Sequence, residues 1–153
     1  MKANSLVEIV ILKNGRDFDI PRYATSGSAG FDLRAAISTP VTLSTGSRYV
    51  CPTGLKMAIP VGFEGQVRPR SGLAARHGIT VLNSPGTVDC DYRGEVKVIL
   101  INHGEEAFII ERGMRIAQMV IAPCLQADLM IVSVLSGETT GRGTRGFGST
   151  GIT

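Results

Sequence analysis

The chain has 153 residues and a formal net charge of +3 at pH 7, which suits one domain with its own core and leaves no room for a second full domain. Apolar residues make up 43% of it and aromatic residues only 5%, with no Trp, so the core is expected to be aliphatic. No apolar run approaches the roughly 20 residues of a membrane span, and no membrane partner is expected.

The cysteines are Cys51, Cys90 and Cys124, and no two of them form a CxxC pair. Their spacing predicts neither a disulfide framework nor a thiolate zinc site. Reduced thiols are typical of a cytoplasmic protein. The apolar stretch near the amino terminus is short and lacks the cleavage pattern of a signal peptide, so we expect a first strand there and a cytoplasmic location.

The positive charge is carried mainly by arginine, because the chain has twelve Arg and four Lys. The planar guanidinium group matches phosphate oxygens in pairs. This bias indicates a phosphate-bearing partner.

Short apolar or alternating runs recur between turn residues. In chain order they lie at 6–12, 54–60, 78–83, 95–102, 107–111, 115–123 and 129–135. Runs of this length and spacing, rich in β-branched residues, predict an all-β sandwich or barrel. Apolar positions nowhere keep a helical period over four turns, so we expect at most one short helix, at 71–78.

Two polar segments interrupt the first half of this pattern. In "AGFDLRA", 29–35, Asp32 stands among apolar residues, where a carboxylate must pair with an arginine or approach a cation. In "PRSGLA", 69–74, Arg70, Ser71 and the following amides can converge on one anion at a helix amino terminus. The alternative is a serine cap with solvated arginines.

The segment "VDCDYRGE", 88–95, is bracketed by Gly86 and Gly94. We predict a β-hairpin whose bend presents Tyr92 as a flat wall and an aspartate at the mouth of a pocket. An extended chain would place the two aspartates on one face, opposite Cys90, so a metal site built from all three requires the strand to break. An aspartate beside a polyphosphate can take a proton from water.

Gln118 is a polar side chain within the otherwise apolar run 115–123. Buried amides need hydrogen-bond partners, so it should face a cavity or an interface. A cross-strand hydrogen bond with a purely structural role is the alternative.

The last 17 residues, 137–153, carry six of the 19 glycines. This composition favours a disordered tail. Phe147 among the glycines, shortly after Arg142 and Arg145, instead suits a nucleotide, which needs an aromatic plane, guanidinium groups and free backbone amides. We divide the chain into a domain at 1–136 and a carboxyl-terminal glycine-rich arm at 137–153.

Taken together, five segments resemble the motifs of the trimeric deoxyuridine triphosphatase (dUTPase) family. They occur in the family's order and span residues 29 to 151, as "AGFDLRA", "PRSGLA", "NSPGTVDCDYRGE", "RIAQ" and "RGTRGFGSTG". The resemblance implies a jelly-roll-like β barrel and a homotrimer whose sites combine motifs of all three chains. The arm 137–153 would close over a neighbouring subunit's site. The reaction would be Mg²⁺-dependent hydrolysis of dUTP to dUMP and pyrophosphate, which supplies dUMP for thymidylate synthesis and keeps uracil out of DNA.

The resemblance also implies a role for individual residues. Asp89 would be the general base that activates water for attack on the α-phosphate, and Tyr92 would lie under the deoxyribose. Asp32 would touch the magnesium ion through a water molecule, since this ion keeps much of its hydration shell. The remaining substrate-binding residues would be Arg70, Ser71, Gly72, Asn83, Gly86, Thr87, Val88, Lys97, Gln118, Arg142, Gly146, Phe147, Gly148 and Ser149.

Two residues depart from the family's usual pattern. Cys90 stands where a small Ser or Ala is common, and we interpret it as a packing residue. Arg145 stands where glycine is common, which leaves the conformation of the arm open.

Three other functions are compatible with parts of the sequence. A deoxycytidine triphosphate deaminase shares the barrel and the trimer, but is expected to lack the "DYRGE" arrangement. An RNA-binding module with an arginine-glycine tail normally repeats its RGG unit, which occurs here once, so no nucleic-acid partner is expected. A jelly-roll subunit without activity leaves the clustered polar residues unexplained.

Overall fold

A computed structural model describes residues 6–137 and 140–146 of the chain. Ten strands and one short α-helix form this part of the molecule, which confirms the all-β prediction. The strands are β1 (Glu8–Ile11), β2 (Gly30–Arg34), β3 (Val41–Leu43), β4 (Arg48–Ala58), β5 (Phe63–Arg68), β6 (Ile79–Val81), β7 (Gly86–Val88), β8 (Glu95–Asn102), β9 (Phe108–Ile110) and β10 (Arg115–Pro123). The helix is α1 (Ser71–His77), and a 3-10 turn, η1 (Lys13–Gly15), follows β1.

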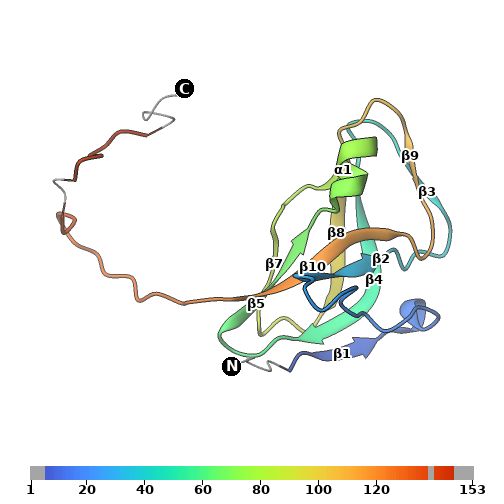
Figure 1. Ribbon diagram of the computed structural model, residues 1–153, viewed down its shortest axis with the longest axis horizontal. Helices are drawn as coiled ribbons and strands as arrows, with labels where there is room; N and C mark the ends of the chain where they lie inside the picture. The colour runs from blue at the N-terminus through green and yellow to red at the C-terminus, as the bar shows by residue number, and fades with distance from the viewer. Residues whose placement is uncertain (1–5, 138–139, 147–153) are drawn as a thin grey trace.

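The strands form two four-stranded sheets and one two-stranded ribbon. The first sheet has the order β1-β4-β8-β6, the second has the order β2-β10-β5-β7, and β3 pairs with β9. Every pairing between named strands is antiparallel. The sheets wrap around one interior in a jelly-roll-like barrel, and α1 stands at one end of it (Figure 1).

The core lies between the inner faces of the two sheets. In β8 the buried and accessible residues alternate, as expected for a strand with one face in a core, so that Val98 and Leu100 are fully buried while Lys97 is exposed. From the other sheet, Leu33 and Met119 reach the same cluster and are also fully buried. Aliphatic side chains dominate this core, as the composition predicts.

The segment between β6 and β8 differs from the predicted hairpin. β6 pairs with β8 in the first sheet, whereas β7 pairs with β5 in the second. The chain from Leu82 to Gly94 therefore crosses from one sheet to the other and returns. The prediction of two mutually paired strands around Gly86 and Gly94 is wrong, because β7 finds its partner in β5.

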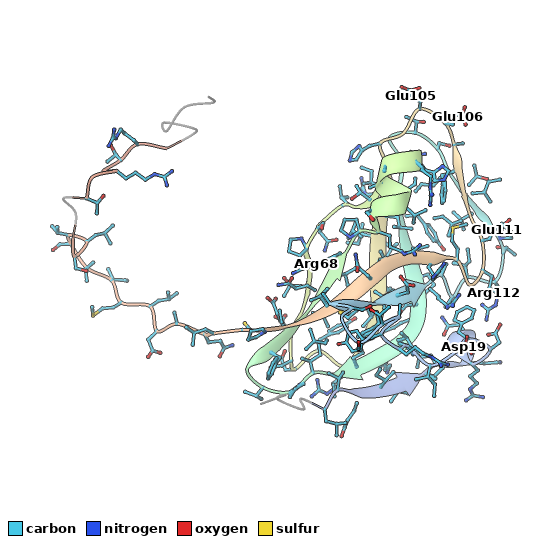
Figure 2. All side chains as sticks on the ribbon, viewed as in Figure 1. Asp19, Arg68, Glu105, Glu106, Glu111 and Arg112 are labelled. Carbon is cyan, nitrogen blue, oxygen red and sulfur yellow. The ribbon has the colours of Figure 1, made fainter. Side chains whose placement is uncertain are left out.

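The apolar run at 129–135 forms no strand, contrary to expectation. Residues 124–137 leave the barrel as an extended arm (Figure 1). Its apolar side chains are exposed, from 46% at Val132 to 101% at Ile131, and the arm and its side chains stand clear of the barrel (Figure 2). A strand needs a neighbour for its backbone groups, and among the residues that the structure describes this run pairs with none.

In the part of the chain that the structure covers, no helix has the length and apolar character needed to cross a membrane.

Candidate functional site

A polar cleft of about 420 Å³ brings together three of the five sequence motifs. Its walls come from β2, from the start of β10, from the first turn of α1 and from the loop before β2. The lining residues are Arg22, Ala24, Ser28, Ala29, Gly30, Phe31, Asp32, Arg70, Ser71, Gly72, Arg115 and Gln118.

Asp32 organises the charges of this cleft. Its Oδ1 lies 3.0 Å from Nε of Arg70, and its Oδ2 lies 3.3 Å from Nη1 of Arg115. The carboxylate side chain remains 32% exposed, so the pair forms at the cleft surface and not in the core. Arg22 also lines the cleft, so three guanidinium groups and one carboxylate give it a positive charge that suits phosphate.

Gln118 faces a cavity and also makes a structural hydrogen bond, although that bond goes to a turn and not to a neighbouring strand. The strand register places it between Asp32 of β2 and Arg68 of β5. Its Nε2 donates a hydrogen bond of 3.0 Å to the carbonyl oxygen of Pro69, which fixes the turn that leads into α1. The same side chain lines the cleft.

The first turn of α1 lies at the cleft without a side-chain cap. Arg70 is the N-cap residue in an extended conformation, and neither it nor a serine donates or accepts a capping side-chain bond. The serine-cap alternative is therefore wrong: Ser71 is already the first helical residue. Since the first amides of a helix have no partner within it, Ser71 and Gly72 bring such amides to the cleft wall.

The segment around Asp89 turns sharply after β7. The amide of Tyr92 donates to the carbonyl oxygen of Asp89 at 3.2 Å, so the alternation expected of an extended chain ends here. The hydroxyl of Tyr92 donates to the carbonyl oxygen of Glu95 at 3.0 Å, and its ring packs directly over Gly94. Asp89 and Tyr92 are both exposed, and the role of Tyr92 as a flat wall for a ligand stays a prediction.

Asp89 lies away from the cleft of its own chain. β7 runs from Gly86, opposite Val67, to Val88, opposite Gly65, and therefore leads away from Arg70. At about 3.3 Å per residue, the five residues from Gly65 to Arg70 correspond to on the order of 15 Å. Within one chain the structure does not bring the aspartate to the arginines.

A second pocket, of about 490 Å³, adjoins Asp89. Its acidic and thiol-bearing lining residues are Glu64, Asp89, Cys90, Asp91 and Cys124. Across residues 6–137 and 140–146, no group of three or more His, Cys, Asp or Glu side chains has a geometry that could hold a metal ion. The break in the strand thus creates no site built from the two aspartates and the cysteine.

The other predicted substrate-binding residues divide into three groups. Asn83, Thr87 and Lys97 are exposed, whereas Gly86 and Val88 are buried, all on or beside the crossing segment. Arg142 and Gly146 lie in the exposed arm, where Nε of Arg142 donates to the carbonyl oxygen of Arg145 at 3.0 Å. Phe147, Gly148 and Ser149 lie outside the described residues.

Two charged residues of the cleft were not among the predicted site residues. Arg115 opens the motif "RIAQ" but received no role, and Arg22 lies in a loop that carries no motif. That loop is held in place because Tyr23 forms a β-bridge with Phe31 and their rings meet edge to face at 5.7 Å. The bias toward arginine over the whole chain was the one available signal for Arg22.

Three thiols are free, and they differ in surroundings. Cys51 is buried, Cys90 is half-buried and Cys124 is exposed. Burial, with a smaller contribution from the charge of Glu95, raises the pKa of Cys51 from 9.0 to about 12. Cys51 therefore stays a protonated packing residue. Cys90 packs against the core, in line with the role expected for it.

Comparison with known proteins identifies the family. The dUTPase family model matches residues 16–151. The chain belongs to the dUTPase family. It is 60% identical over 148 residues to a deoxyuridine 5'-triphosphate nucleotidohydrolase from Rhizobium etli, with 95% of this chain and 94% of the relative covered.

Solved structures of dUTPases share the fold. The dUTPase of Staphylococcus bacteriophage 80alpha with dUpNHpp superposes with a TM-score of 0.84 at 25% identity, covering 96% of this chain and 99% of that one. A mutant dUTPase from phage phi11 of S. aureus, whose structure reveals the coordination of a structural Mg(II) ion, superposes with a TM-score of 0.75 at 21% identity, covering 86% of this chain and 99% of that one. The jelly-roll-like barrel expected from the resemblance is thereby confirmed.

Proposed function

We propose that this enzyme hydrolyses dUTP to dUMP and pyrophosphate by attack of a water molecule on the α-phosphate. Hydrolysis of dUTP follows from membership of the dUTPase family at 60% identity to a curated relative. The observation that carries the site assignment is the cleft in which Arg70 and Arg115 converge on Asp32 beside the first turn of α1.

In this proposal the cleft holds the phosphates. Arg70 offers a guanidinium fork whose direction is set by Asp32, while Ser71 and Gly72 offer a hydroxyl and backbone amides. Gln118 keeps the turn before α1 in place through Pro69 and adds an amide group to the wall. Catalysis by positioning and by charge neutralisation is the general pattern for phosphoryl chemistry.

Asp89 acts as the general base, from a second copy of the chain. Its distance from the arginines of its own chain, on the order of 15 Å along β5, argues for sites that combine segments of different subunits. We propose a homotrimer with three such sites. Tyr92 lies under the deoxyribose and excludes a 2'-hydroxyl by contact, and Asn83, Gly86, Thr87, Val88 and the main chain at Lys97 recognise uracil.

The arm completes the site of a neighbouring subunit. The apolar side chains of residues 125–135 are exposed and are not covered by the described part of this chain, so a surface on another subunit suits them. We assign residues 1–136 to the catalytic domain and 137–153 to a lid over the neighbour's site. Arg142, the backbone from Gly146 to Ser149 and the ring of Phe147 clasp the γ end and stack on the base.

Asp32 would contact a magnesium ion through a water molecule. Both oxygens of Asp32 are engaged by arginines, so this carboxylate suits contact with the ion through water and not direct ligation. A magnesium ion carried by the phosphates fits these residues and would neutralise charge on the phosphoryl groups. The phi11 relative coordinates a structural Mg(II) ion, which supports a role for this metal in the family.

Three free cysteines are typical of a reducing compartment, so we place the enzyme in the cytoplasm. There it supplies dUMP for thymidylate synthesis and keeps uracil out of DNA.

One assay tests the function. Pyrophosphate release is measured for each deoxynucleoside triphosphate, with and without magnesium, and ammonia release is measured for dCTP. We expect pyrophosphate from dUTP alone, at a rate that falls when the metal is chelated. Ammonia from dCTP would instead identify a deaminase with the same barrel.

A further inference from the structure

A β-bulge in β4 lies opposite the start of β8, and the hydrogen bonds around it link the rest of the barrel to Tyr92. Pro52 pairs with Lys97 and Lys56 pairs with Glu95, so four steps along β4 match only two along β8. The additional residues leave the ladder, as in other β-bulges. Gly54, with a φ of 72°, occupies the left-handed conformation that this bulge needs.

The side chain of Glu95 replaces the ladder bond that the bulge removes. Its Oε1 accepts a hydrogen bond of 2.9 Å from the amide of Gly54 and a second of 3.0 Å from Nδ2 of Asn14 in η1. These bonds to a carboxylate are of the stronger, charge-assisted kind. They attach the first residue of β8 to two elements that are distant in the sequence.

The main chain of the same residue holds the Tyr92 ring. The carbonyl oxygen of Glu95 accepts the bond from the Tyr92 hydroxyl, and this is the one side-chain hydrogen bond of Tyr92 among the described residues. The ring lies so close over Gly94 that a Cβ there would come within 2.3 Å of the hydroxyl oxygen. The orientation of Tyr92 therefore depends on where Glu95 is fixed.

We propose that Glu95 is a positioning residue for sugar selectivity. Its carboxylate is held by Gly54 and Asn14, and this fixes the position of its carbonyl oxygen. The carbonyl oxygen in turn holds the Tyr92 ring against the sugar. The inference rests on the proposed role of Tyr92 under the deoxyribose. A 2'-hydroxyl is rejected only if the ring cannot retreat, so a rigid anchor behind the ring determines the discrimination between dUTP and UTP.

The test compares kcat/KM for dUTP and for UTP, by pyrophosphate release, in matched variants. Glu95→Ala removes the acceptor of both bonds and should reduce the preference for dUTP about tenfold, the scale of one steric contact in a pocket. The change should come from a higher kcat/KM for UTP, while kcat for dUTP is altered less than about twofold. Glu95→Gln keeps one amide oxygen as an acceptor and should retain the wild-type preference.

Thr53→Val is the structural control in the same bulge. The hydroxyl of Thr53 donates to the carbonyl oxygen of Val96 at 2.6 Å and does not touch the Glu95 side chain. This variant should be less stable than wild type in urea but should keep the wild-type preference for dUTP. If Thr53→Val lowers the preference as much as Glu95→Ala does, Glu95 is merely structural and the inference is overturned.

Two further variants, Asn14→Ala and Tyr92→Ala, complete the test. If Glu95→Ala does not fold, Asn14→Ala, which spares the Gly54 bond, should lower the preference in the same direction, and a wild-type preference there overturns the inference. Tyr92→Ala separates the two proposals. If it lowers the preference while Glu95→Ala does not, only the positioning role is wrong, and if it changes nothing, the sugar wall itself is wrong although dUTP hydrolysis stands.

Discussion

Arg70 and Asp32 lie side by side at the cleft, with Nε of the arginine 3.0 Å from Oδ1 of the aspartate. The contact joins the start of α1 to β2, two elements separated by three strands in the sequence. It also fixes which way the remaining donors of the guanidinium group can point.

Replacement of Arg70 by lysine should therefore weaken substrate binding although the charge is kept. An ammonium group is a point charge without the planar fork of a guanidinium group, so it cannot bind two phosphate oxygens side by side. We expect KM for dUTP to rise about tenfold, which corresponds to about 1.4 kcal/mol. Arg68→Lys is the matched control, because Arg68 lies two residues away in β5 and its side chain hydrogen-bonds to Gln66; a similar rise in KM there would contradict the assignment of Arg70.

Replacement of Asp89 by asparagine should remove the base and leave the binding surface in place. Turnover should fall by about two to four powers of ten, the usual scale for a lost general base, while the Kd for a non-hydrolysable dUTP analogue stays near wild type. Asp91→Asn serves as the control, since Asp91 lines the same pocket two residues further on. Normal turnover in Asp89→Asn would show that another group takes the proton.

Truncation of the arm should separate assembly from catalysis. Deletion of the residues after Ser136 removes the glycine-rich segment but keeps the exposed apolar run, so the trimer should persist with reduced turnover. Deletion after Cys124 removes that run as well and should yield monomers. Light scattering after size exclusion, combined with the pyrophosphate assay, distinguishes these results. Monomers after the shorter deletion would show that the glycine-rich segment itself holds the subunits together.

Alkaline pH should destabilise the fold partly through Cys51. Burial raises the pKa of this thiol from 9.0 to about 12 in the folded chain. Between pH 9 and about pH 12, the thiol therefore loses its proton in the unfolded chain and keeps it in the folded chain. Its stabilising contribution is complete below pH 9 and is lost as the pH rises toward 12. Urea unfolding midpoints should fall less steeply over this window in Cys51→Ala than in wild type. Cys124→Ala, at an exposed thiol, should keep the wild-type slope.

Elements with a regular apolar pattern could be predicted from the sequence. The runs at 95–102 and 115–123 match β8 and β10 at both ends, and α1 lies within the predicted 71–78. β5 was missed because Gly65 stands where the alternation needs an apolar side chain; in the fold, a Cβ there would meet Met119 and Ile59. The first half of β4 was missed because Pro52 and Gly54 interrupt its pattern.

The sequence could name candidate residues for the cleft, but it could not predict their arrangement. Spacing along the chain cannot show that Asp32 receives two arginines, because Arg70 and Arg115 come from distant segments. The predicted hairpin failed for a related reason: local turn signals at Gly86 and Gly94 describe where the chain bends, whereas pairing of β7 with β5 depends on the whole sheet. The run 129–135 was predicted to be a strand because its composition is right, but among residues 6–137 and 140–146 it pairs with no other strand.

The crossing of residues 82–94 between the two sheets has a mechanical consequence. Both ends of this segment join strands of the first sheet, β6 and β8, while β7 in its middle pairs with β5 of the second sheet. If the proposed uracil contacts form on this segment, a bound nucleotide links the two sheets, and amide exchange should slow in β5 and β8 together when it binds. The same thirteen residues would then both recognise the base and hold the two sheets together.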